Sequence, residues 1–113
     1  MQMQPRVYIP QIVKKMDPTR GVMVEAHDYK PAMLHGQLTP ILDDGDSALY
    51  LSRHVHKIKK ILSDFTHEDY LIAVGDPCLI AVCAGIIMRR QPTFTMLKWE
   101  RTMRQYIKME ISV

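Results

Sequence analysis

The stretch from residue 70 to residue 88 constrains the fold more than any other part of the chain. It opens with YLIAV, an unbroken apolar run typical of a strand that is buried on both faces. Gly75, Asp76 and Pro77 follow, and they predict a turn, a helix N-cap and the first helical position. Residues 78–88 carry no charge, so we expect a helix packed on nearly every side. Together these features predict an α/β fold with this strand and helix at its centre.

The segments on either side of this unit supply a second helix and more strands. A helix is predicted from Ala48 to Phe65, where apolar residues recur at helical spacing. Residues 94–99 and 105–113 have the composition of strands, and 37–42 is a short strand candidate that its proline weakens. Helical connections of this length favour parallel neighbours, whereas the last two strands form an antiparallel hairpin.

The first 36 residues are expected to be more loosely structured than the rest. Residues 6–13 favour a strand, but Pro10 predicts a position at a sheet edge or at a bulge. Turn residues at 16–21 and a strand at 22–26 complete a loose hairpin, and one helical turn is expected within 28–36. The prediction is therefore one small α/β (or α+β) domain over residues 1–113, with a small mixed sheet, two main helices and a central parallel βαβ unit.

Composition limits the class of protein. Fifteen Lys and Arg against twelve Asp and Glu give a net charge of +3, which is weaker than a dedicated nucleic-acid binder of this length usually shows. No apolar run is long enough to cross a bilayer and no signal peptide is visible, so we expect a cytoplasmic protein without a membrane partner. Cys78 and Cys83 point to different sides of one helix, and they are expected to be buried and reduced.

Two acidic loops should meet at the carboxyl ends of the parallel strands, where ligands gather in open α/β sheets. The crevice residues are Asp43, Asp44 and Asp46 in one loop, with Gly75 and Asp76 in the other. Such carboxylates could hold Mg²⁺ or act as acid and base. Helix capping and solvation explain them more simply, and we favour that interpretation. The negative charge also disfavours a nucleotide site.

No cofactor, no metal site and no catalytic residue are predicted. His54 and His56 lie two positions apart on the predicted helix and face different ways. The spacing of the cysteines and histidines does not match that of a zinc site.

A set of basic residues could follow a phosphate backbone. It comprises Arg53, His56, Lys57 and Lys60 on the predicted helix, with Arg101, Arg104 and Lys108 on the hairpin. Trp99 and Tyr106 could stack on bases beside them, or could pair with each other across the hairpin. An ordinary solvated helix face is the simpler interpretation of the helical residues.

The segments YLIAVGDPCLIAVCAGI (70–86) and MLKWERTMRQYIKMEISV (96–113) resemble a family of small proteins of tailed bacteriophages, notably short-tailed phages of marine bacteria. The resemblance rests on residues 70–77, 97–99 and 104–107, with a fainter match at 7–11. It covers about the C-terminal half of the chain, and the two cysteines depart from the alanines expected in the helix. It implies a viral origin and a role inside the infected cell, and it transfers no catalytic residue.

The expected function is therefore that of a non-enzymatic, phage-type accessory protein that binds a host or phage protein. Self-association through the edge strand Gln105–Val113 is one form of this prediction. The alternative is nucleic-acid binding by the basic set. A small Mg²⁺-dependent enzyme built on the aspartate cluster is the third and weakest alternative.

Overall fold

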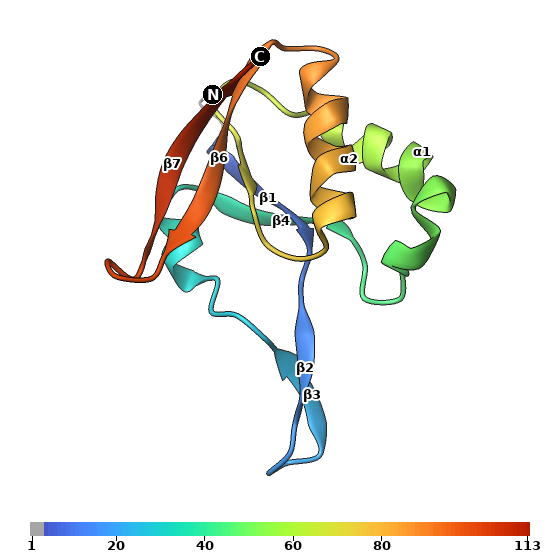
Figure 1. Ribbon diagram of the computed structural model, residues 1–113, viewed down its shortest axis with the longest axis vertical. Coiled ribbons are helices and arrows are strands. Elements are labelled where there is room, and N and C mark those ends of the chain that lie inside the picture. The colour runs from blue at the N-terminus through green and yellow to red at the C-terminus, as the bar shows by residue number, and fades with distance from the viewer. Residues whose placement is uncertain (1–3) are drawn as a thin grey trace.

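A five-stranded sheet forms the centre of the computed structural model, which describes residues 4–113 (Figure 1). The strands lie in the order β4–β1–β5–β6–β7. Neighbours from β4 to β6 run parallel, and β7 is antiparallel to β6. The bounds are Gln37–Leu42 for β4, Arg6–Gln11 for β1, Tyr70–Ile72 for β5, Thr93–Glu100 for β6 and Gln105–Ser112 for β7. The predicted mixed sheet with a parallel βαβ unit and a C-terminal hairpin is confirmed.

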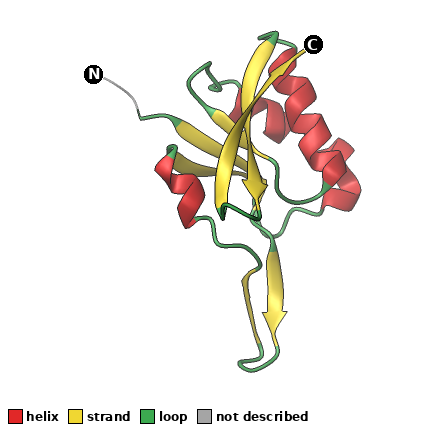
Figure 2. Cartoon of the chain, turned by 60° about the vertical axis from the view of Figure 1, so that its left-hand side comes forward, coloured by secondary structure: helices red, strands yellow, loops and turns green. Residues whose placement is uncertain are grey.

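Helices cover both faces of this sheet unequally (Figure 2). Tyr8 and Leu71 pack beneath the two α-helices, whereas Val7 and Ile72 pack on the opposite face against Tyr29. Successive residues of one strand thus enter two different cores, as the alternation of side chains along a strand requires. The helices are α1 (Leu51–Leu62) and α2 (Pro77–Met88) on one face, and the 3-10 helix η1 (Lys30–Leu34) on the other.

The central strand and the turn after it agree with the sequence prediction. β5 is the third of the five strands, so both its edges are paired. Gly75 has a φ of +104°, a conformation that side chains rarely allow. The Asp76 Oδ1 atom accepts hydrogen bonds from the backbone N–H groups of Cys78 (2.8 Å) and Leu79 (3.0 Å). The carboxylate therefore caps α2 as predicted.

The prediction that α2 is packed on nearly every side is wrong. Its buried side chains recur every fourth residue from Leu79 to Ile87, whereas Cys78, Ala81 and Gly85 are exposed. The helix lies on the sheet and against α1, and its outer face is open to solvent. Small residues expose little apolar area, so the lack of charge on that face did not require burial. Cys78 also contradicts the prediction that both thiols are buried.

The two thiols should therefore react very differently. Burial raises the pKa of the Cys83 thiol to about 12, so almost no thiolate forms there at pH 8. We expect a thiol-specific reagent to label one cysteine in the native protein, and both after denaturation. Labelling of a Cys78→Ser variant in the native state would contradict this expectation.

The position of β1 also differs from the prediction. Pro10 indicated an edge strand or a bulge, yet β1 lies between β4 and β5, and Val7, Tyr8 and Ile9 are completely buried. Pairing with β5 involves only Val7 and Tyr8, so the proline lies beyond the last residue that pairs on that side. The missing N–H consequently interrupts no pairing with β5. Within the segment expected to be loosely structured, β1 is part of the core.

The N-terminal hairpin exists, but a different segment forms its first strand. β2 (Lys14–Asp17) pairs antiparallel with β3 (Val22–Glu25) in a separate two-stranded sheet that projects from the body (Figures 1 and 2). We call residues 14–25 the arm. At its base, the Ala26 N–H donates to the Val13 carbonyl oxygen (2.7 Å), and the Val13 N–H donates to the buried Tyr29 hydroxyl (3.2 Å).

The helix predicted from Ala48 to Phe65 is shorter in the structure, where α1 covers only Leu51–Leu62. A 3-10 turn, η2 (Ala48–Tyr50), precedes α1, and the Ser47 Oγ atom accepts a hydrogen bond from the Leu49 N–H (3.3 Å). Ser47 thus caps the start of this turn. Across residues 4–113, no helix is both long enough and apolar enough to cross a membrane.

The predicted strand at 37–42 is confirmed, and Pro40 is tolerated because β4 is an edge strand. The residue before it, Gly36, is closely approached by the chain that leads into β1. A Cβ atom on Gly36 would lie 2.3 Å from the Pro5 carbonyl oxygen. The Gln37 N–H donates to the same oxygen at 2.8 Å, so the two segments are held together at this point.

We expect Gly36→Ala to lower the free energy of unfolding by about 1–3 kcal/mol, because backbone must move to admit the methyl group. Gly45→Ala is the control, since a Cβ atom there would have no neighbour within 4 Å. Urea denaturation followed by circular dichroism measures both variants. Equal stability of the two variants would show that the contact between Gly36 and Pro5 is not tight.

Candidate functional site

A crevice of about 830 Å³ lies where β1, β4 and β5 end. Four of the five crevice residues predicted from the sequence line it: Asp44, Asp46, Gly75 and Asp76. Asp43 lies in an adjoining hollow that shares Asp44. The remaining walls come from the end of β1 and from the arm. The topology therefore brings the two acidic loops together at the carboxyl edge of the sheet.

Lysines form ion pairs with three of the four aspartates around this crevice. The Lys57 Nζ atom lies 2.7 Å from the Asp43 carboxylate and 2.5 Å from that of Asp46. The hydrogen bond from Lys57 lowers the pKa of Asp46, and the hydrogen bonds to Asp43 and Asp46 raise the pKa of Lys57. Asp44 forms an ion pair with Lys14 at the start of the arm.

Two side chains, those of Gln11 and Asp46, also form hydrogen bonds with backbone groups of the acidic loop after β4. The Gln11 Nε2 atom donates to the carbonyl oxygens of Asp43 (2.8 Å) and Asp46 (2.7 Å), and so ties the end of β1 to the loop after β4. The Asp46 Oδ2 atom also accepts from the Asp43 N–H (2.9 Å). In the described part of the chain, no three His, Cys, Asp or Glu side chains are grouped as a metal site would require. This arrangement orders a loop and caps α2, and it offers no unengaged cluster of carboxylates.

The predicted basic set does not form one surface. Lys57 turns toward the aspartates, and the Arg53 guanidinium lies 4.5 Å from the centre of the Tyr50 ring. His56 is exposed on α1, and Lys60 lines a small hollow between α1 and the sheet. Arg101 and Arg104 belong to the turn between β6 and β7, on the opposite side of the molecule from α1 (Figure 1).

The hairpin aromatics pair with each other. Trp99 faces Tyr106 across the β6–β7 hairpin, with ring centres 5.0 Å apart and an interplanar angle of 65°. This edge-to-face contact is the simpler of the two arrangements considered from the sequence. Lys108 lies over the Tyr70 ring, 5.4 Å from its centre, so this basic side chain also has a partner within the fold.

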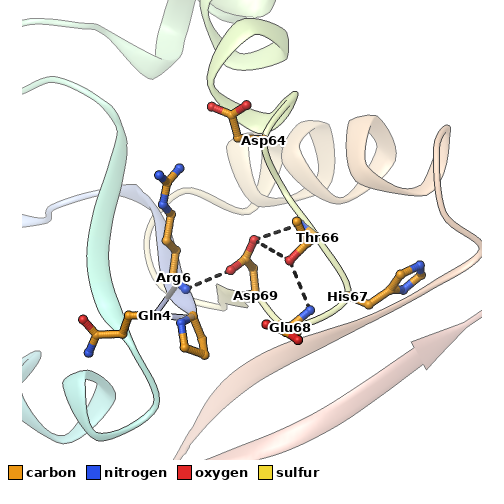
Figure 3. Close-up of a pocket in the computed structure, with 8 residues that line it drawn as sticks. Gln4, Arg6, Asp64, Thr66, His67, Glu68 and Asp69 are labelled. Atoms are coloured by element: carbon orange, nitrogen blue, oxygen red, sulfur yellow. Dashed lines mark hydrogen bonds between the residues drawn. The ribbon is translucent and has the colours of Figure 1, made fainter. Parts of the chain in front are cut away.

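A second hollow, of about 660 Å³, lies at the opposite end of the sheet beside the start of β1 (Figure 3). Its centre is the buried Asp69 carboxylate, which accepts hydrogen bonds from the Arg6 N–H (2.8 Å), the Thr66 N–H (2.8 Å) and the Thr66 hydroxyl (3.0 Å). The carboxylate fastens the beginning of β1 to the loop before β5. Sequence reasoning missed this residue, although the spacing of Thr66 and Asp69 is typical of a side-chain-stabilised turn.

We expect Asp69→Ala to lower the free energy of unfolding by about 2 kcal/mol, because two backbone N–H groups lose their acceptor in a partly buried place. Asp64→Ala is the matched control, since Asp64 lines the same hollow and is exposed. The Asp64→Ala control should change the free energy of unfolding by no more than about 0.5 kcal/mol. Thermal unfolding measures both, and a control as damaging as Asp69→Ala would refute the role of Asp69.

The structure is a small mixed α/β domain, and comparison with protein families assigns it to proteins of bacteriophages. The chain belongs to the Phage Pam3 gp32-like protein family, whose model matches residues 5–113. This match confirms the phage resemblance and extends it from the C-terminal half to nearly the whole chain. No curated protein and no solved structure matches the chain.

Proposed function

We propose that this chain is a non-enzymatic accessory protein that binds a host or viral protein in the cytoplasm of the infected cell. We further propose that its source lies among short-tailed phages of marine bacteria. Membership of a phage family supports the viral setting. The observation that carries the binding proposal is the arm, which projects from the body and exposes apolar side chains.

The arm presents a pair of methionines at the surface. Met16 and Met23 face each other across the two strands, and their exposed fractions are 57% and 55%. Val22, on the other face of the hairpin, is 47% exposed. Methionine is flexible and polarizable, which suits it to contacts with surfaces of varied shape. These side chains can therefore supply apolar contact area to a partner.

The arm also lacks a core of its own. An isolated two-stranded hairpin is only marginally stable in water, because neither of its faces is covered. Packing against a partner would bury the methionine pair and stabilise the hairpin at the same time. This coupling favours an arm that binds over an arm that merely connects β1 to β4.

Nucleic-acid binding has less support. The basic residues of α1 and of the β6–β7 turn lie on different sides of the molecule, and Lys57 is paired with two aspartates. A continuous positive path for a phosphate backbone is the usual requirement for such binding.

The test uses purified protein as bait in lysates of infected and uninfected cells. We expect Met16→Ser plus Met23→Ser to reduce recovery of the captured partner by roughly tenfold or more, because the apolar contact area of the arm is lost. Quantitative mass spectrometry of the captured proteins gives the measurement.

The matched control is Met33→Ser plus Met103→Ser, which replaces two methionines of similar exposure (53% and 55%) outside the arm. Recovery of the partner should be unchanged with this control. Equal recovery with the arm variant and the wild type would exclude the arm as the binding surface, and absence of any specific capture would count against protein binding.

A further inference from the structure

The two edges of the sheet differ in how they are protected. β4 carries Pro40, which removes one backbone donor from its edge. β7 has eight residues, no proline and an uninterrupted register with β6 from Ser112 to Gln105. In the part of the structure that is described, β7 pairs with β6 alone. The 3-10 helix η1 contacts β7 from one face of the sheet, but pairs with neither edge of the strand. A long, regular edge strand of this kind is a template for another strand.

The sequence of β7 is complementary to itself. We propose that a second copy of this chain pairs antiparallel with β7 about a two-fold axis at Met109, extending the sheet across the two copies. In this register Lys108 lies opposite the partner's Glu110, and Glu110 lies opposite the partner's Lys108. Ile107 then faces the partner's Ile111, and the two Met109 side chains meet at the axis. A two-fold interface of this kind requires one patch to complement itself.

Charge selects this register over its neighbours. Antiparallel strands alternate between hydrogen-bonded and non-hydrogen-bonded residue pairs, and a two-fold axis can pass through either kind. The nearest alternative symmetric registers therefore have their axis one residue away, at Lys108 or at Glu110. Moving the axis to Lys108 sets two lysines opposite each other, and moving it to Glu110 sets two glutamates opposite each other. Directly opposed like charges destabilise a strand pair, whereas opposite charges stabilise it. Of these three registers, the one centred on Met109 forms two ion pairs and opposes no like charges.

The apolar residues of β7 support the same arrangement. Ile107, Met109 and Ile111 alternate with the charged residues and therefore lie on one face of the sheet. Ile111 packs against the core beneath the helices, whereas Met109 is 41% exposed. Pairing of two copies would continue this apolar row across the axis and cover Met109. The surface differs from the arm, so this inference does not rest on the proposed function.

Reversal of single charges tests the register. We expect Lys108→Glu and Glu110→Lys each to raise the dimer dissociation constant by roughly ten- to thirty-fold, because two attractive pairs become repulsive. The double variant Lys108→Glu plus Glu110→Lys should restore dimer formation. Analytical ultracentrifugation over a range of concentrations, with reductant present, gives the dissociation constants.

Lys98→Glu is the matched control, because it makes the same charge change at an exposed residue of the neighbouring strand β6. It should leave the dissociation constant unchanged. Thermal unfolding of each variant separates loss of pairing from loss of folding, which matters because Lys108 also contacts Tyr70. A monomeric wild type at every concentration, or single variants that dimerise as the wild type does, would overturn the proposal.

A cross-link provides a second measurement. With Cys78→Ser as background, Met109→Cys should form an intermolecular disulfide on oxidation, because opposed Cα atoms lie roughly 4.5–5.5 Å apart in antiparallel pairs. Ile111→Cys should not, because the two introduced side chains would be offset by about 13 Å along the strands. Efficient linkage through residue 111, or none through residue 109, would contradict the register.

Discussion

The burial of β1 on both faces and along both edges is the constraint on which the rest of the structure depends. Tyr8 belongs to the core beneath α1 and α2, whereas Val7 and Ile9 belong to the core beneath η1. The same strand pairs with β4 on one side and β5 on the other. It therefore joins the two cores and sets the distance between the acidic loops that follow its neighbours. Gln11 extends this role by holding the loop after β4 in place.

The parts of the fold that the sequence predicts well are those with local signals. The apolar run of β5, the capping aspartate and the helix after it form one continuous pattern, and the structure agrees with it. The position of β1 inside the sheet could not be predicted from local signals of this kind. Proline disfavours a central strand in general, because it removes a backbone donor. Whether Pro10 interrupts a sheet hydrogen bond depends on which residues of β1 pair with β5, and β5 lies about 60 residues further along the chain.

The candidate site shows the same division. Strand direction alone places the two acidic loops at one edge of the sheet, and residues of both loops line the crevice there. The partners of these carboxylates were missed, because Lys57 reaches them only through the orientation of α1, and Lys14 only through the path of the arm. Asp69 was missed for a related reason. Its carboxylate accepts a hydrogen bond from the backbone N–H of Arg6, which is distant in sequence, so no local pattern indicates the contact.

The way the arm joins the body has a consequence for how far it can reach. The arm interrupts the connection between β1 and β4, and it is fixed at its base by Val13, Ala26 and the buried Tyr29. Nothing in the register of the large sheet depends on the length of β2 and β3. Adding two residues to each strand would move the tip outward by roughly 7 Å and keep every side chain on its original face. The distance that the hairpin spans is thus adjustable by small insertions, independently of the core.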